Sequence, residues 1–160
     1  MESRALLGAL AEVEVRFVLV GGVAAVLHGV PVNTFDVDVV QARDPENARR
    51  LAGVLRSLDA CYRDHLPKRL EPSEEDLTLP DHHRLLARYG PLDILGRIAG
   101  EKGYEDLIDR APLTDLGRGL RVHVLDLEVL VEVKESLGRD KDRAQLLEYR
   151  RTLEERRRTT

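Results

Sequence analysis

Hydrophobic and polar positions follow two different periods along this chain. Apolar residues that recur every three to four positions predict a helix, and short continuous or alternating apolar runs predict a strand. We expect helices at about residues 3–13, 23–28, 45–58, 104–110, 127–137 and 139–157. We expect strands at about residues 16–20, 34–41, 84–89, 92–95 and 120–125. Residues 59–81 are polar and poorly periodic, so no element is predicted there.

The order of these elements predicts an α/β fold of the mixed (α+β) kind. Too few helices separate the strands for a wholly parallel sheet. We therefore expect a mixed β-sheet flanked by helices, with further helices at the C-terminal end. A length of 160 residues suits one domain with a sizeable core. We place that core at about residues 15–125 and the C-terminal helices at about 127–158.

Composition limits the class of protein. Hydrophobic residues make up 42% of the chain and charged residues 34%, which is typical of a globular protein. The net charge of −4 gives no general attraction to nucleic acid. No apolar run reaches the ~18 residues that span a bilayer, and the N-terminal stretch has no signal-peptide pattern. The single Cys61 excludes an internal disulfide. We expect a cytoplasmic protein with no membrane partner and an idle thiol.

Two aspartates interrupt an otherwise apolar strand. Alternation along a strand puts Thr34, Asp36 and Asp38 on one face. The other face carries apolar residues that we expect in the core: Phe35, Val37 and Val39. The aspartates lie roughly 6.5–7 Å apart at their Cα atoms, and their charges repel. A hard divalent cation such as Mg²⁺ would relieve that repulsion. The alternative is the solvated outer face of an edge strand.

Gly21-Gly22 adds a second signal to the aspartate pair. The two glycines follow a predicted strand and open a predicted helix. Glycine lets the backbone approach a ligand closely, and the N–H groups at a helix start favour phosphate. Neither the dinucleotide fingerprint nor the P-loop pattern is present. A phosphate site beside a metal site would hold a nucleoside triphosphate together with its Mg²⁺.

With these motifs in place, the chain resembles the DNA polymerase β-like nucleotidyltransferase superfamily. The resemblance is strongest to the small bacterial branch that includes abortive-infection-type toxin nucleotidyltransferases. A glycine turn before a helix matches Gly21-Gly22, and an apolar strand with two aspartates matches residues 35–39. The third carboxylate of that family corresponds to Asp93 in Leu92-Asp93-Ile94.

The resemblance extends over about residues 15–145 and includes a C-terminal element. That element is a lysine on one helix and an R-x-K-D sequence opening the next. Its counterparts here are Lys134, Arg139, Lys141 and Asp142. Relatives commonly carry an arginine two positions before the threonine, where this chain has Val32. The departure bears on nucleotide affinity and substrate choice, not on the metal ligands.

The resemblance implies a metal-dependent nucleotidyltransferase. Such an enzyme moves a nucleoside monophosphate from a nucleoside triphosphate to a hydroxyl on an RNA end, a protein or a small molecule, here in a toxin–antitoxin or phage-defence setting with a cognate partner protein. The implied cofactor is Mg²⁺ or Mn²⁺. The implied catalytic and metal-binding residues are Asp36, Asp38 and Asp93. The implied nucleotide-binding residues are Gly21, Gly22, Thr34, Lys134 and Lys141.

Two other interpretations stay open. The chain could be a non-catalytic partner or antitoxin that keeps the nucleotidyltransferase fold, which Val32 favours. It could also be a structural domain with a polar edge strand, which leaves the glycines and aspartates unconnected. Among the histidines, we expect His28 to close its turn and His82 and His83 to lie in an exposed loop.

Overall fold

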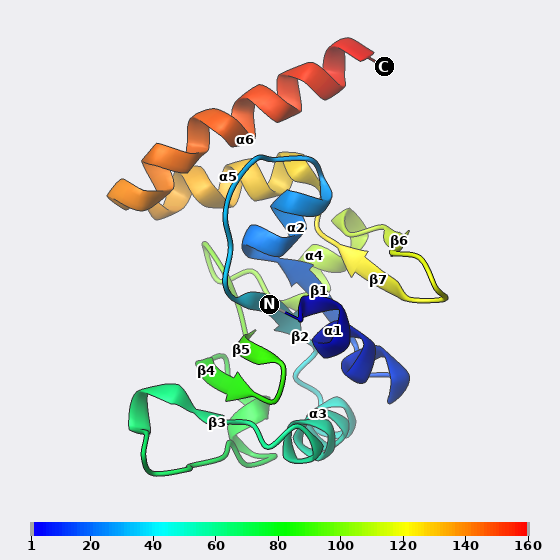
Figure 1. The fold of residues 1–160 in the computed structure, drawn as a ribbon, viewed down its shortest axis with the longest axis vertical. Helices are drawn as coiled ribbons and strands as arrows, with labels where there is room; N and C mark the ends of the chain where they lie inside the picture. Colours follow the sequence, from blue (N-terminus) through cyan, green and yellow to red (C-terminus); the bar gives the residue numbers. More distant parts are fainter. Residues whose placement is uncertain (1, 160) are drawn as a thin grey trace.

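A seven-stranded mixed sheet forms the centre of the protein (Figure 1). The computed structural model describes residues 2–159. The strands are β1 (Phe17–Val20), β2 (Val37–Gln41), β3 (Cys61–Tyr62), β4 (His82–Ala87), β5 (Gly90–Leu95), β6 (Leu113–Asp115) and β7 (Arg121–Val124). They lie in the order β3-β4-β5-β2-β1-β7-β6. The β1–β7 and β2–β5 pairs are parallel and the remaining pairs are antiparallel. The mixed fold predicted from the sequence is therefore confirmed.

Helices surround this sheet unevenly. The α-helices are α1 (Ser3–Glu12), α2 (Gly21–Leu27), α3 (Pro45–Ser57), α4 (Tyr104–Leu107), α5 (Leu127–Leu137) and α6 (Asp140–Thr159). Short 3₁₀ turns are η1 (Arg63–His65), η2 (Asp76–Thr78) and η3 (Ile108–Arg110). In Figure 1, α5 and α6 lie together at one end of the molecule, and α3 and β3 lie at the other. Because α2 contacts β1, β2 and α5, it joins the sheet to the C-terminal helices.

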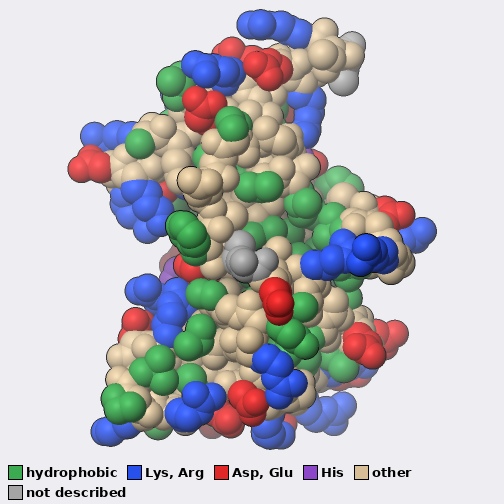
Figure 2. Space-filling view, viewed as in Figure 1, with side chains coloured by type: hydrophobic (Ala, Val, Ile, Leu, Met, Phe, Trp, Pro, Cys, Tyr) green, Lys and Arg blue, Asp and Glu red, His purple; other side chains and the backbone are tan. Residues whose placement is uncertain are grey.

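The surface carries both signs of charge. On the face drawn in Figure 2, acidic and basic side chains are interspersed over both ends of the molecule, in keeping with the net charge of −4. Within residues 2–159, no helix combines the length and the apolar character needed to cross a bilayer.

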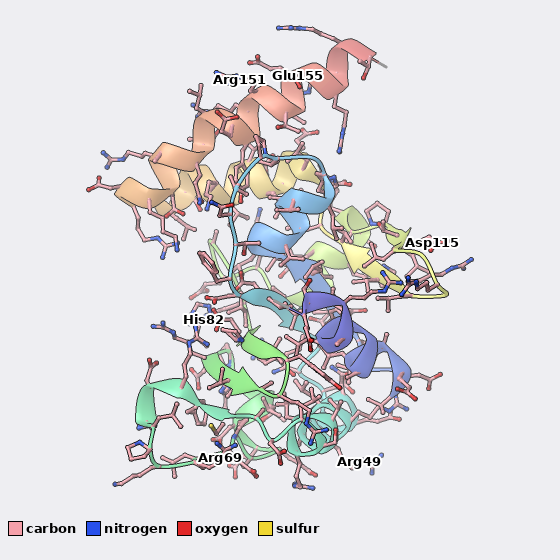
Figure 3. The ribbon with its side chains drawn as sticks, viewed as in Figure 1. Arg49, Arg69, His82, Asp115, Arg151 and Glu155 are labelled. Carbon is pink, nitrogen blue, oxygen red and sulfur yellow. The ribbon has the colours of Figure 1, made fainter. Side chains whose placement is uncertain are left out.

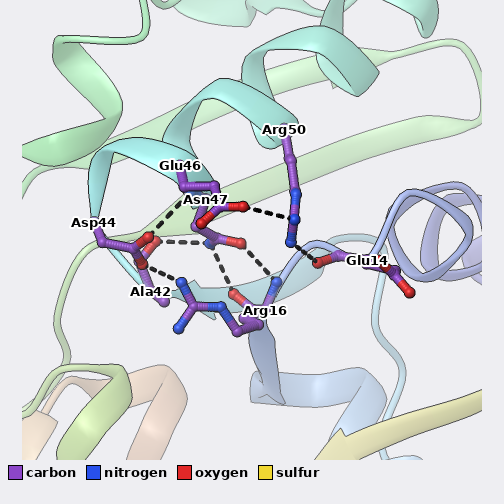
Figure 4. A network of polar contacts seen from close by, with 7 residues as sticks. All are labelled: Glu14, Arg16, Ala42, Asp44, Glu46, Asn47 and Arg50. Atoms are coloured by element: carbon purple, nitrogen blue, oxygen red, sulfur yellow. Dashed lines mark hydrogen bonds and ion pairs between the residues drawn. The ribbon is translucent and has the colours of Figure 1, made fainter.

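A buried asparagine fixes the start of α3 against the sheet (Figure 4). The Asn47 side chain accepts a hydrogen bond from the Arg16 N–H at 2.8 Å and donates to the carbonyls of Arg16 at 3.0 Å and Ala42 at 2.7 Å. Asp44 caps the helix by accepting from the Asn47 N–H, with Pro45 at the first helical position. These bonds satisfy polar groups that would otherwise be costly to bury. The predicted cap is therefore also a junction between α3 and the sheet.

The predicted strand at 34–41 is shorter in the structure, and the expectation for Phe35 was wrong. The strand begins at Val37, and the Phe35 side chain is 76% exposed. Val37 pairs with Leu92 of β5, but on the other side of β2 the strand β1 ends at Val20, which pairs with Asp38. Residues before Val37 have no strand partner on that side, because the chain turns into α2 at Gly21. No core layer therefore covers Phe35.

The expectation that His82 and His83 lie in an exposed loop was also wrong. Both belong to β4, where residues alternate between exposed and buried, and His83 is only 4% exposed. Its Nδ1 atom lies 2.8 Å from the Tyr62 hydroxyl. Pairing with β5 starts β4 at His82, two residues before the predicted boundary. The short strands β3 and β6 were not predicted, because a run of two or three residues carries no readable period.

Candidate active site

Two aspartates lie directly opposite each other at the centre of the sheet. The parallel register of β2 and β5 pairs Asp38 with Asp93 at their Cα positions. Their strand neighbours Val39 and Ile94 point to the opposite, fully buried face. Alternation on both strands therefore places the two carboxyl groups on the same side of the sheet, although Asp93 comes 55 positions after Asp38 in the sequence.

The Asp38 carboxyl group is electrostatically strained. Burial, followed by the charge of Asp93, a hydrogen bond to Asp93 and the charge of Asp36, raises the pKa of Asp38 to about 8. Lys141 acts in the opposite direction as the smallest contribution. A carboxyl group in such surroundings keeps its proton near neutral pH unless a cation arrives. A nearby positive charge would favour the charged form of Asp38 and so oppose this shift.

Gly21 and Gly22 allow the backbone to pass close to this acidic group. A Cβ atom on Gly21 would lie 2.2 Å from Asp38 Oδ2, and one on Gly22 would lie 2.5 Å from Thr34 Oγ1. Gly21 also has φ of +68°, which side-chain-bearing residues rarely adopt. The glycines are therefore required by the packing of Asp38 and Thr34, independently of any phosphate.

A cavity of about 620 Å³ opens over these residues. Its walls include all the residues that the sequence suggested for metal and nucleotide binding: Gly21, Gly22, Thr34, Asp36, Asp38, Asp93, Lys134 and Lys141. Apolar side chains of Leu130, Val133 and Leu137 from α5 line another part of it, and Val32 faces it as well. His82, labelled in Figure 3, also lies on the cavity wall at the start of β4. The cavity therefore combines acidic, basic and apolar surfaces.

Arg63 is a member of this site that the sequence did not suggest. Its Nη1 atom donates to Asp93 Oδ1 at 2.7 Å and to the Leu85 carbonyl at 3.0 Å. Its Nη2 atom lies 3.6 Å from Asp36 Oδ2. The Arg63 side chain is 17% exposed, so this is a largely buried ion pair. Arg63 belongs to η1, within the segment without periodicity, and no local pattern points to it.

The donor set fits a hard divalent cation in part. Asp38 and Asp93 present carboxylate oxygens side by side, which is the ligand type that Mg²⁺ prefers. Asp36 instead faces Arg63, and its side chain is 40% exposed. Across the described part of the chain, no three His, Cys, Asp or Glu side chains are already grouped as a metal site. Asp38 and Asp93 are thus preassembled as a pair, while Asp93 and Asp36 are both engaged with the guanidinium group of Arg63.

The C-terminal lysine and R-x-K-D element form a compact ion-pair group. Asp142 is fully buried and accepts from Lys134 Nζ at 3.0 Å and from Arg139 Nε at 2.5 Å. Burial by itself would raise the pKa of Asp142, but the bonds and charges of Arg139 and Lys134 outweigh it and lower that pKa. Lys134 also lies 5.1 Å from the ring centre of Tyr149. This group ties α6 to α5 and fixes Lys134 at the cavity wall.

His28 has a structural place, as expected. Its Nε2 atom lies 2.8 Å from the Leu125 carbonyl, and Arg156 Nη2 donates to the His28 carbonyl at 3.0 Å. The residue joins the end of α2 to α6 and to the segment before α5.

Comparisons with known proteins bear on the fold. No protein-family model matches the chain, and no curated protein matches it. A solved structure that resembles it is the crystal structure of a "putative nucleotidyltransferase" from Thermotoga maritima, with 21% sequence identity and a TM-score of 0.57. The match covers 96% of this chain and 91% of that one. At this identity the likeness shows the fold, which is nucleotidyltransferase-like, with C-terminal helices.

Proposed function

We propose that this protein is a metal-dependent nucleotidyltransferase that transfers a nucleoside monophosphate from a nucleoside triphosphate to a hydroxyl group. The observation that carries the proposal is the in-register pair Asp38–Asp93, with Asp36 on the same cavity wall. A carboxyl pair in which the pKa of Asp38 rises to about 8 costs stability, which suits a site that binds cations. The nucleotidyltransferase-like fold supports the same reaction class.

In this proposal Asp36, Asp38 and Asp93 hold Mg²⁺ or Mn²⁺. The bound cations would stabilise the attacking and leaving oxygens of an in-line displacement. A new bond forms between the acceptor oxygen and the α-phosphorus, the bond from that phosphorus to the bridging oxygen breaks, and pyrophosphate leaves. Asp93 takes the proton of the acceptor hydroxyl. The protein contributes mainly position and charge.

The remaining cavity residues are assigned to the nucleotide. Gly21, Gly22 and Thr34 line the same cavity as Asp38, and we assign their backbone N–H groups and the Thr34 hydroxyl to phosphate oxygens. Lys134 on α5 and Lys141 on α6 bring positive charge to the cavity wall, which suits a triphosphate. Because Asp142 already neutralises Lys134 in part, we assign the larger share of phosphate attraction to Lys141.

We place the reaction in the cytoplasm, within a toxin–antitoxin or phage-defence system that includes a cognate partner protein. The resemblance of the glycine turn and paired aspartates to the small bacterial branch supports the defence setting, and the single Cys61 fits a reducing compartment. The acceptor is an RNA end, a protein hydroxyl or a small molecule.

Incubation with each labelled nucleoside triphosphate, Mg²⁺ or Mn²⁺, and either total RNA or cell lysate tests the proposal. We expect label in one macromolecular or small-molecule fraction, with its loss in Asp38→Asn. Label of equal amount with Asp38→Asn would contradict the assignment of the site. Absence of label with every nucleotide, acceptor and metal would favour the non-catalytic partner.

A further inference from the structure

Arg63 contacts the carboxylates to which we assign the divalent cation. Its guanidinium group contacts Asp93 Oδ1 at 2.7 Å and lies 3.6 Å from Asp36 Oδ2, so one positive group spans two of the three carboxylates. Arginine suits this task because its planar fork can address two acceptors at once. The contact is not a loose surface pair, since the side chains of Arg63 and Asp93 are 17% and 16% exposed.

The same guanidinium is anchored to the sheet as well as to the carboxylates. Arg63 Nη1 also donates to the Leu85 carbonyl on β4, at 3.0 Å. Arg63 itself belongs to η1, which contacts β4 and follows β3 at the edge of the sheet. The side chain therefore reaches from the edge of the sheet to its acidic centre.

We infer that Arg63 is a resident counter-cation, and that a divalent cation binds the carboxylates only by displacing its guanidinium group from Asp93 and Asp36. This inference rests on the proposed function. Two positive groups that share Asp93 Oδ1 in a part-buried site repel each other strongly. In the free protein the Arg63 contacts neutralise part of the acidic charge, whereas in the metal-bound protein the cation would do so.

The inference predicts that the effect of Arg63→Gln on the melting temperature changes sign when Mn²⁺ is added. An arginine with a purely structural role would not show this change. Without divalent cation, Arg63→Gln leaves the carboxylates without their counter-charge, and the melting temperature falls. With saturating Mn²⁺, the same variant loses a competitor, and its melting temperature equals or exceeds that of the wild type. We expect its affinity for Mn²⁺ alone to rise by about tenfold or more, because a charge-assisted contact no longer has to be broken.

The experiment is calorimetric and spin-resonance titration of the full chain with Mn²⁺, combined with melting curves with and without Mn²⁺. Arg84→Gln is the matched control. Arg84 is opposite Asp93 on β4, but its ion pair is with Asp64 at 3.8 Å and its side chain is 57% exposed. Arg84→Gln removes one positive charge from the strand beside Asp93 but leaves the contact between Arg63 and Asp93 in place. We expect its Mn²⁺ affinity to change much less than that of Arg63→Gln.

The outcomes separate the inference from the proposed function. Unchanged or weaker Mn²⁺ affinity in Arg63→Gln, or an equal rise in Arg84→Gln, overturns displacement, while Mn²⁺ binding that Asp38→Asn abolishes still supports the proposed function. An equal loss of melting temperature with and without Mn²⁺ also overturns it. Binding in no variant overturns both. An Arg63→Gln protein that folds only with Mn²⁺ supports displacement, because the variant is then destabilised without the cation and recovers its stability with it.

Discussion

Asp38 and Asp93 face each other across two parallel strands, and together they line one wall of the central cavity. Neither residue is adjacent to the other in sequence, and the pairing of β2 with β5 alone brings them together. Their nearness makes two full negative charges unfavourable in a buried place. The stability of the protein and the chemistry proposed for it therefore depend on the same pair.

The raised pKa of Asp38 predicts a pH-dependent stability. In the folded protein this pKa is about 8, above its ordinary value of 3.8. Between the two values the folded state keeps a proton that the unfolded state has lost, so the free energy of unfolding falls as the pH rises. Asp38→Asn should remove this decline. Denaturant unfolding of both proteins at several pH values measures the difference, and parallel profiles would contradict the prediction.

Nucleotide and metal should stabilise the protein together. A ligand at about 100 times its dissociation constant adds ~2.7 kcal/mol to the free energy of unfolding. For a domain of this size, 1 kcal/mol moves the melting temperature by roughly 2–4 °C, so we expect a rise of about 5–10 °C. Mg²⁺ or nucleotide alone should give less. Asp38→Asn should lose most of the rise while remaining folded, because Asn is nearly isosteric. A wild type that no nucleotide stabilises would point to the non-catalytic partner.

Replacing Gly21 and replacing Gly53 by alanine should change the free energy of unfolding in opposite directions. Gly21→Ala forces a side chain into φ of +68° and against Asp38, and we expect it to lower the free energy of unfolding by about 1–3 kcal/mol. Gly53→Ala is the control, because Gly53 lies within α3 with no atom near its added Cβ. It should raise the free energy of unfolding by about 0.5–1 kcal/mol. Denaturant unfolding gives both values, and equal signs would be evidence against the close packing of Gly21.

Removing the charge of Asp142 should loosen α6 from α5. Asp142→Asn leaves Lys134, whose side chain is 13% exposed, without its charged partner. Breaking a buried pair in this way costs about 3 kcal/mol. The melting temperature should then fall by roughly 6–12 °C. Asp140→Asn on the same helix is the control, since Asp140 is fully exposed and lies 3.9 Å from Arg143. Differential scanning calorimetry compares the two, and similar melting temperatures would contradict the assignment.

Local signals in the sequence predicted much of the fold. The cap at Asp44 and Pro45 placed α3 correctly, because a helix start depends on residues within one turn. The apolar residues on either side of Asp93 predicted β5, because this signal also lies within a few residues of sequence. Strand ends were less predictable. Alternation predicted that Phe35 continues β2, but pairing with β1 stops at Asp38 and pairing with β5 stops at Val37. Both partner strands lie far from Phe35 in the sequence, so no local pattern indicates these limits.

The clustering of the candidate residues follows from motifs that the sequence shows, whereas contacts between distant segments were missed. The glycine turn, the paired aspartates and Lys141 all lie on one cavity. Arg63 was missed because it reaches Asp93 from a segment without periodicity, 30 residues away in sequence. The sequence indicated Arg63 only indirectly, because three neighbouring carboxylates require a nearby positive charge. The pairing of Lys134 with Asp142 was not predicted either, because no local pattern indicates that a side chain on α5 contacts one on α6.

The alignment of β2 with β5 also acts as a check on correct folding. Because side chains alternate along a strand, a slip of one residue in this pairing would carry Asp93 to the side occupied by Val37 and Val39. An unpaired carboxylate among those fully buried valines would be very costly. Chains with the wrong alignment are therefore unstable and also lack the paired aspartates. Molecules that survive folding carry an assembled acidic centre, so the fraction of folded protein and the fraction with a complete site should be the same.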